Sequence, residues 1–382
     1  MTIMANSTIT GNPSHLHAVT SGLLIIDKPQ GVTSHDMVAA VRGALHMKRV
    51  GHAGTLDPMA TGVLIIGFGN ATRLLNVIVD HDKTYEATIR LGQRTTTDDA
   101  DGDVVPGDNA VTDIAYEDIV AMIDDRFTGD IEQVPNAYSA IKINGRRAYD
   151  LARDGKQVDL KARPVTVSEF TVLDVRRGAT CATTPGMPLQ EYDDDSSIPV
   201  VDVDVRVSCS AGTYIRALAR DLGDALGVGG HLIRLRRTRI GGYRVDGQHV
   251  VTARTESRTF TTRNGETMTR NRAVLDCSPE QLIDASLSMV AAARSAMPSA
   301  AIDGEQARDL RFGRRVTLDP DAIIDAGAQS DTSHDGTEGN HHMALSTSHR
   351  RIAVYVSGTD DLVAIVEPCG HGMAKPVTVF PQ

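Results

Sequence analysis

Three segments in which apolar and polar residues alternate strictly constrain the fold of this chain more than any other feature. They are TYEATIRLG at 84–92, VTVSEFTVLDV at 165–175 and VVDVDVRVSCS at 200–210. Successive side chains of a strand point to opposite faces, so a period of two predicts strands that bury one face. The chain is therefore expected to contain a half-buried sheet.

Helical segments are interspersed with further strands. A helix is expected from Thr33 or Ser34, either of which can cap it, to about Leu45, and another over 213–227, where GVGGH ends it. The other expected elements are strands at 22–29, 63–69 and 232–245, a helix from about Ala71, and a strand, an Asn144-Gly145 turn and a short basic helix over 139–155. This mixture predicts an α+β fold.

Changes in composition divide the chain into three parts. Residues 1–20 lack the basic start and apolar core of a signal peptide, so we expect a disordered tail. Residues 21–295 carry the strong patterns and predict a large domain, with polar insertions near 177–199 and 256–272. Residues 296–382 contain short strand-like pieces around a polar, His-rich stretch at 325–349, which is typical of a small β-rich domain with a disordered loop.

Composition excludes several classes of protein. Four scattered cysteines without a CxxC pair indicate neither a zinc site nor a disulfide framework, and they suit a reducing cytoplasm. No segment approaches the ~18 consecutive apolar residues of a membrane span. The net charge is −10, yet seven arginines lie between Tyr214 and Arg244. Such a local basic field attracts phosphates, although a solvated basic face would have the same composition.

The stretch GHAGTLDPMATGVL at 51–64 carries the clearest chemical signal. Glycines let a backbone approach a ligand closely, and Pro58 biases the preceding Asp57 toward an extended conformation. One carboxylate is therefore presented from a constrained loop. Four further blocks follow the same order as in a known family: LIIDKP at 24–29 with GVTS at 31–34, DKTY at 82–85, YSAIK at 138–142, and CSAGTYIR at 209–216.

With these five blocks the chain resembles the TruB family of tRNA pseudouridine-55 synthases, over about residues 22–244 apart from the insertion at 177–199. The resemblance implies a large mixed-sheet pseudouridine synthase catalytic domain. It also implies isomerisation of uridine to pseudouridine in the T-loop of tRNA, on a base that has been flipped out of its stack. No cofactor and no metal are implied.

The resemblance assigns three catalytic residues. Asp57 falls on the family's catalytic aspartate, and Tyr85 on the aromatic side chain that stacks on the flipped base and could also remove the C5 proton. Arg216 matches the arginine that pairs with the aspartate; such a pair is expected to lower the aspartate pKa and keep it ionised. Taken singly, Tyr85 could equally be a core residue and Arg216 a solvated charge.

Further positions are assigned to substrate binding. His52 matches a residue that supports the rearranged RNA loop, while Tyr214 and Leu235 match residues that line the pocket. The basic segment 138–163 matches an insertion that closes over the RNA, in which Lys142, Arg146 and Arg147 would contact phosphates. A supporting element near the site is formed by Lys28 and Pro29.

The C-terminal region resembles a PUA-like RNA-binding domain, through GEQA at 304–307, Leu310, Gly313 and Gly358. It would bind the acceptor-stem end of tRNA. The resemblance implies a cytoplasmic monomer whose partner is the T-arm of tRNA, with no membrane and no obligate protein partner. The stretch Asn340-His341-His342 could suggest a metal site, but two histidines in a polar loop are better explained as solvated.

Two other functions remain open from the sequence. The first is the catalytic subunit of a guide-RNA-directed pseudouridylation particle, which would use Asp57 and Tyr85 in the same way but depend on partner proteins. The second is an RNA-folding factor that binds the tRNA elbow without chemistry. Activity of the isolated chain on bare tRNA distinguishes the first, and the substitution Asp57→Asn distinguishes the second.

Overall fold

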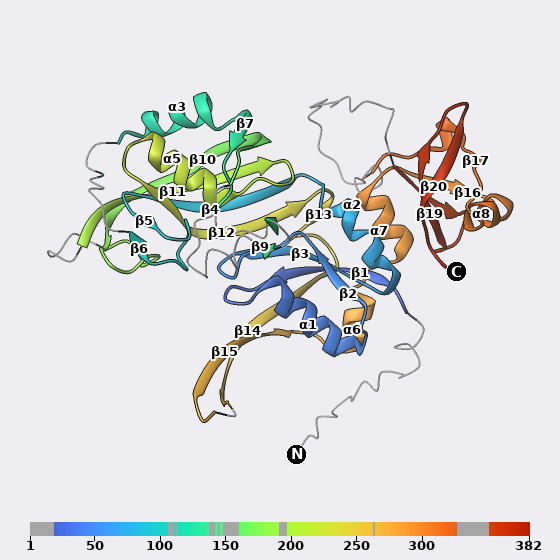
Figure 1. Cartoon of the computed structure of the whole chain (residues 1–382), viewed down its shortest axis with the longest axis horizontal. Helices are drawn as coiled ribbons and strands as arrows, with labels where there is room; N and C mark the ends of the chain where they lie inside the picture. Colours follow the sequence, from blue (N-terminus) through green and yellow to red (C-terminus); the bar gives the residue numbers. More distant parts are fainter. Residues whose placement is uncertain are drawn as a thin grey trace, which may run out of the picture.

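A computed structural model describes residues 19–105, 111, 114–136, 142–143, 146–147, 160–190, 197–262, 264–326 and 351–382. Two sheets organise these residues, a large one and a smaller C-terminal one that lies at the opposite end of the elongated molecule (Figure 1). The disordered tail expected at 1–20 falls almost wholly outside the described residues, as does the loop expected at 325–349. No helix within the described ranges is long and apolar enough to cross a membrane.

The large sheet contains eleven strands in the order β15-β14-β1-β3-β12-β4-β11-β10-β7, with β13 paired to β12 and β2 to β3. Most pairs are antiparallel, but β1 with β14 and β3 with β12 are parallel, so the sheet is mixed. The strands are β1 Gly22–Lys28, β2 Val50–Ala53, β3 Thr61–Phe68, β4 Lys83–Leu91, β7 Gly129–Gln133, β10 Arg163–Cys181, β11 Ser197–Cys209, β12 Gly230–Ile240, β13 Tyr243–Arg244, β14 Val250–Thr261 and β15 Thr267–Leu275.

The alternating segments form three adjacent strands of this sheet, β4, β11 and β10, as their pattern predicts. On β11 the buried Val203, Val205 and Val207 point into the core that the sheet shares with helix α5. The opposite face is less exposed than expected, because Arg90 on β4 and Asp202 on β11 are both buried there. Two hydrogen bonds of 2.7 and 2.8 Å join them, so the buried charges are paired.

Helices cover the sheet. Helix α1 (Ser34–Leu45) begins at Thr33, whose hydroxyl accepts a hydrogen bond from the Asp36 amide while the Asp36 carboxylate accepts one from the Thr33 amide. The expected helix from Ala71 is instead a 3-10 turn followed by the four-residue helix α2 (Leu75–Ile78). The remaining helices of this part are α3 Tyr116–Arg126, α5 Ile215–Ala225, α6 Pro279–Asp284 and α7 Met289–Ala296.

The C-terminal sheet has the order β16-β18-β19-β20-β17. Its strands are β16 Ser299–Ile302, β17 Val316–Thr317, β18 Ile352–Val356, β19 Leu362–Pro368 and β20 Met373–Val379. The expectation of a β-rich domain is confirmed, but residues 304–311 are not strand-like. They form helix α8 (Gly304–Arg311), because Asp303 and Gln306 make a capping box that starts a helix there.

Both expected insertions contain regular structure. Residues 177–181 and 197–199 extend the β10–β11 ladder, although their sequence shows no alternation. Most of segment 256–272 lies in β14 and β15, which pair as a long antiparallel ribbon. Both ladders persist because backbone hydrogen bonds between two strands do not require an apolar face. Smaller pairs are β5 Arg94–Thr95 with β6 Val104–Val105, and β8 Lys142–Ile143 with β9 Arg146–Arg147.

Candidate active site

The loop that carries Asp57 connects β2 to β3 and is fixed by neighbours from the start of the chain. The Ser34 hydroxyl donates to the Leu56 carbonyl (3.1 Å) and accepts from the Leu56 amide (2.8 Å). The Gly31 amide donates to the Pro58 carbonyl (2.8 Å). Just after the loop, at the start of β3, Gly62 has a φ of +99° and approaches the backbone of β12 so closely that there is no room for a Cβ. Asp57 is therefore held by a rigid backbone.

Arg216 binds the Asp57 carboxylate in a two-point ion pair. Its Nε lies 3.0 Å from Oδ2 and its Nη2 lies 3.1 Å from Oδ1. The Arg216 side chain is only 6 % exposed, whereas that of Asp57 is 33 % exposed. The planar guanidinium thus fixes the orientation of the carboxylate while leaving it accessible from solvent. Because Arg216 lies on the first turn of α5, this helix brings the two residues together across 159 positions of sequence.

Asp99 is part of the same network and was not predicted from the sequence. Its Oδ2 lies 3.1 Å from Arg216 Nη1, on the opposite side of the guanidinium from Asp57. The acidic run DDADGD at 98–103 has the composition of a loop, but Asp99 within it is buried. A buried guanidinium has five N–H donors, more than one carboxylate can accept, so a second acceptor for Arg216 was a foreseeable requirement. The sequence did not indicate which residue would supply that acceptor.

The pKa of Asp57 differs from the expectation. Burial raises the pKa of this carboxyl, and the nearby Asp99 raises it further, while Arg216 and Lys28 act in the opposite direction. The expectation that Arg216 leaves the pKa low was therefore wrong in its net direction, because desolvation outweighs the ion pair.

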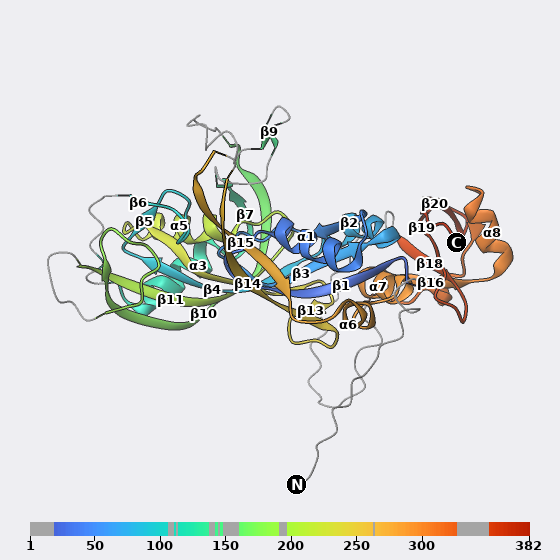
Figure 2. The ribbon, with the colours of Figure 1, turned by 90° about the horizontal axis from the view of Figure 1, so that it is seen from below.

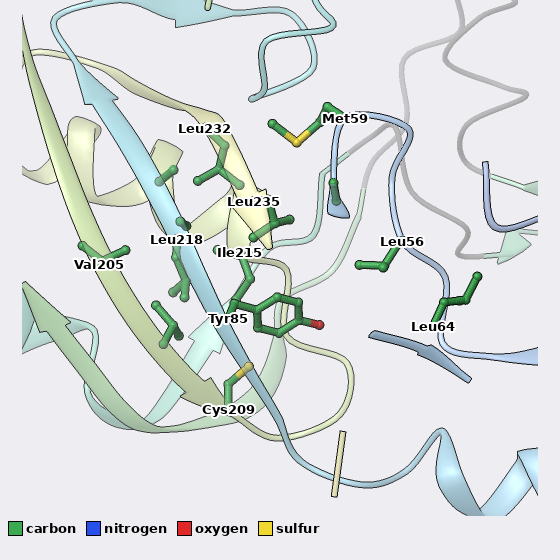
Figure 3. Close-up of a cluster of buried hydrophobic side chains, with 14 of the residues drawn as sticks. Leu56, Met59, Leu64, Tyr85, Val205, Cys209, Ile215, Leu218, Leu232 and Leu235 are labelled. Atoms are coloured by element: carbon green, nitrogen blue, oxygen red, sulfur yellow. The ribbon is translucent and has the colours of Figure 1, made fainter. Parts of the chain in front are cut away.

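A cavity of about 280 Å³ lies beside Asp57, large enough for one nucleoside. Its lining brings together residues that are distant in sequence, including Asp57, Lys83, Tyr85, Tyr214, Arg216, Leu235 and Arg237. Tyr85 is buried, and its hydroxyl points toward the segment that carries Leu56, with Ile215 and Leu235 nearby (Figure 3). Burial raises the pKa of Tyr85, so its phenol is neutral near pH 7.

Arg237 supports the cavity from β12. It is almost fully buried, and its guanidinium donates to the carbonyls of Val63 (2.8 Å), Gly54 (3.1 Å) and Thr55 (3.4 Å). These contacts hold both ends of the Asp57 loop against the sheet. The positive charge of Arg237 also partly opposes the rise in the pKa of Tyr85.

Lys28 and Lys83 are two buried lysines beside the cavity. Lys28 Nζ donates to the carbonyls of Val32 (2.7 Å) and Pro29 (2.9 Å) and to that of Pro58 (3.4 Å), in the loop that carries Asp57. Lys83 lines the cavity itself and donates to the Val79 carbonyl (2.6 Å). Burial lowers the pKa of both lysines to about 8.

The remaining predicted residues are divided between the cavity and its surroundings. Tyr214 caps α5, and its backbone amide and carbonyl are both bound by the Gln133 side chain, at 2.8 and 3.1 Å. His52 lies on β2, outside the cavity lining, and burial lowers its pKa. The side chains of Lys142, Arg146 and Arg147 lie outside the described residues, although their backbones pair in β8 and β9.

No set of three or more His, Cys, Asp or Glu side chains is arranged to hold a metal ion in the part of the chain that the structure describes. The stretch Asn340-His341-His342 falls outside that part.

Comparison with known proteins identifies similar chains along most of the sequence. Residues 42–215 match the family model described as "TruB family pseudouridylate synthase (N terminal domain)", and residues 216–271 match that of the "tRNA pseudouridylate synthase B C-terminal domain". The tRNA pseudouridine synthase B of Bifidobacterium longum (strain DJO10A) is 51 % identical, with 96 % of this chain and 99 % of the relative covered. The protein of the same name from Arthrobacter sp. (strain FB24) is 44 % identical, with 94 % and 96 % covered.

Solved structures share the fold at lower identity. A Cbf5-Nop10-Gar1 complex contains a chain with a TM-score of 0.58 and 23 % identity, covering 97 % of this chain and 86 % of that one. An H/ACA RNP bound to a substrate RNA containing 2'-deoxyuridine gives a TM-score of 0.57 and 22 % identity, covering 97 % and 88 %. At this identity the likeness concerns the fold, with its large mixed sheet and its C-terminal β-rich domain.

Proposed function

Because this chain belongs to the TruB family of pseudouridylate synthases, we propose that it isomerises the uridine at position 55, in the T-loop of tRNA, to pseudouridine. The shared name of the relatives supports tRNA as the substrate. The observation that carries the proposal is the Asp57 carboxylate, which Arg216 orients at the wall of a cavity with room for one nucleoside.

The reaction is balanced within the nucleotide. The bond between ribose C1′ and uracil N1 breaks, the base turns, and a bond between C1′ and C5 forms. C5 loses a proton and N1 gains one, so the product is an isomer and we propose that no cofactor takes part. Asp57 acts as a covalent catalyst, and its ionised form can attack either ribose C1′ or the base. Arg216 holds it in the geometry that either attack needs.

Tyr85 is proposed as the surface on which the flipped base stacks. Flipping costs a few kcal/mol, and one aromatic stack returns ~1–3 kcal/mol. The neutral phenol suits this role better than removal of the C5 proton, because its raised pKa makes the phenolate scarce. Leu235 and Tyr214 complete the walls around the base. We propose Asp99 as a positioning residue, since it contacts Arg216 rather than the reacting atoms.

Regions outside the cavity are proposed to bind the rest of the tRNA. His52 supports the rearranged T-loop, Lys28 and Pro29 support the catalytic loop, and Lys142, Arg146 and Arg147 contact phosphates.

We propose that the C-terminal sheet is a PUA-like domain that binds the acceptor-stem end. Phe312, which is 73 % exposed and has the Arg314 guanidinium 5.8 Å from its ring centre, supports this role. We further propose that the protein acts as a monomer in the cytoplasm.

Release of tritium from tRNA transcripts that contain [5-³H]uridine tests the proposed reaction. The isolated wild type is expected to release tritium, and Asp57→Asn is expected to release none while still binding tRNA. Replacing the T-loop uridine by cytidine should abolish release by the wild type. Release that survives this replacement would contradict position 55 as the target.

The same assay separates the two alternatives. A catalytic subunit that depends on partner proteins would fold and bind RNA, yet release no tritium from bare tRNA. An RNA-folding factor would accelerate tRNA refolding equally well as wild type and as Asp57→Asn, without release from either.

A further inference from the structure

The β14–β15 ribbon extends well beyond the body of the large sheet. Its ladder runs from the pair Ala253–Leu275 to the pair Thr261–Thr267, and most side chains in its outer half are exposed. Figure 1 shows it curving away below α1, and Figure 2 shows it rising on the same side of the molecule as β9. An exposed two-stranded ribbon has little stability of its own. We therefore looked to its side chains for a function.

The two faces of the ribbon differ sharply in chemistry. In an antiparallel pair, residues directly opposite each other share a face. All four arginines that the structure describes in the ribbon fall on one face: Arg254, Arg258, Arg270 and Arg272. The other face carries hydroxyl and amide groups: Thr255, Ser257, Thr259, Thr261, Thr267, Thr269 and Asn271. This segregation defines a cationic face and a hydroxyl face.

Charge on the cationic face is neutralised near the body of the sheet but only partly farther out. Glu256 binds Arg254 (2.8 Å) and Arg272 (2.6 Å). One step outward, Arg258 and Arg270 lie directly opposite each other, an arrangement that is unfavourable without an anion. Arg270 is 76 % exposed and reaches Asp36 at 3.4 Å, while Arg258 has no carboxylate within ion-pair distance among the described residues.

Two side chains of the hydroxyl face attach the ribbon to the active site. The Thr255 hydroxyl donates to the Gln30 carbonyl (2.6 Å), and the Asn271 amide donates to the Gly31 carbonyl (3.0 Å). Gly31 in turn binds Pro58, the residue after Asp57. The ribbon is therefore fixed relative to the loop that carries Asp57.

We propose that the cationic face of the β14–β15 ribbon binds the phosphate backbone of the substrate RNA outside the flipped nucleotide, with Arg258 and Arg270 as its phosphate ligands. This inference rests on the proposed function, because it takes the same RNA as its ligand. A phosphate between the two arginines would supply an anion for Arg258 and a second one for Arg270, which contacts Asp36. Phe260 and Met268, paired one step farther out and 41 % and 51 % exposed, would contact a sugar or base.

The test is the affinity of full-length tRNA transcript for the double variant Arg258→Gln/Arg270→Gln at several salt concentrations. We expect about tenfold weaker binding at low salt, and a plot of log K against log salt whose slope is smaller in magnitude by about 1 to 2. The rate of the chemical step at saturating tRNA should equal that of the wild type. The matched control is Arg126→Gln/Arg177→Gln, which removes two exposed arginines on α3 and β10, at the opposite side of the molecule (Figure 1).

The outcomes are distinguishable. Affinity and salt slope equal to those of the wild type would overturn the role of the ribbon while leaving the proposed function intact. A wild type that binds tRNA but releases no tritium would remove the proposed function instead. Arg258→Lys/Arg270→Lys is expected to retain most of the affinity, because lysine also binds phosphate; loss in this variant equal to that in the glutamine variant would indicate a structural role.

Discussion

At the scale of single residues, the site depends on one arginine shared between two carboxylates. Arg216 orients Asp57, and Asp99 in turn fixes Arg216 from the other side. The ionisation of Asp57 is set mainly by burial, which raises its pKa; Arg216 acts in the opposite direction and Asp99 raises the pKa further. The position and the charge of the Asp57 carboxylate are therefore both controlled by its neighbours in the folded protein.

Asp99→Asn is expected to lower the single-turnover rate by about 10- to 100-fold, because Arg216 and hence Asp57 lose part of their positioning. The acid limb of the pH–rate profile should also move to lower pH, since a charge that raises the Asp57 pKa has been removed. The neighbouring Asp98→Asn is the control, because Asp98 pairs with Arg220 instead. An unshifted acid limb in Asp99→Asn would reduce Asp99 to a structural role.

Asp57→Asn is expected to be at least as stable as the wild type at pH 7. The folded pKa of Asp57 is raised, so the folded protein binds this proton more tightly than the unfolded chain does. Ionised Asp57 consequently costs stability at neutral pH, and stability is regained as pH falls through the folded pKa. Thermal unfolding at pH 7 measures this, and a large fall in Tm for Asp57→Asn would contradict it.

The sequence motifs were enough to predict that Arg216 pairs with Asp57, and the structure confirms this ion pair. Asp57 and Arg216 lie in dense family motifs, so both could be named from the sequence. Asp99 lies in an acidic run that resembles a solvated loop, and its burial depends on β12 and α5, more than a hundred residues later. The rise in the Asp57 pKa has the same origin, since desolvation is a property of the assembled site.

At the scale of elements, a single glycine, Gly62, allows the start of β3 to approach β12 closely. At Gly62, an added Cβ would lie 2.1 Å from the Arg237 carbonyl oxygen, and its φ of +99° suits only glycine. Gly43, within α1, has no atom within 4 Å of the same position. A side chain is therefore excluded at Gly62 but can be accommodated at Gly43.

Gly62→Ala is expected to lower the free energy of unfolding by roughly 2–4 kcal/mol through strain and overlap, and to lower the reaction rate with it. Gly43→Ala should instead raise the free energy of unfolding by ~0.5–1 kcal/mol, since alanine favours a helix. Chemical denaturation of both variants measures the difference. Equal effects at the two positions would contradict the close approach at Gly62.

Element prediction was right for the alternating strands and for the capped helix at 34–45, because local pattern decides both. It was wrong at 304–311, where the capping pair Asp303 and Gln306 was present but overlooked. The ribbon of β14 and β15 was missed for a different reason. Its two faces are both polar, so it lacks the apolar alternation that identifies a strand.

At the scale of the whole molecule, an acidic protein is proposed to bind a polyanion through local basic surfaces. The net charge is −10. Many arginines are neutralised by a neighbouring carboxylate, for example Arg236 by Asp27 and Arg239 by Asp82. Binding is then governed by the few arginines that remain uncompensated. Sequence composition predicts the charge of each segment but not which charges are paired.

Affinity for tRNA is expected to fall steeply with salt in spite of the acidic composition. If four phosphates are contacted, log K should fall against log salt with a slope of about −3 to −4. Equilibrium binding measured from about 50 to about 200 mM salt gives this slope. A flat dependence would show that local basic surfaces do not govern binding.

Parallel pairing of β1 with β14 has a consequence for synthesis on the ribosome. Ile25 pairs with Val250, so one edge of the first strand stays unpaired until more than two hundred further residues have been made. An unpaired edge can join other chains, and the nascent protein must pass through this exposed stage. The hydrogen bonds that Thr255 and Asn271 donate to the loop after β1 also form only at that late stage.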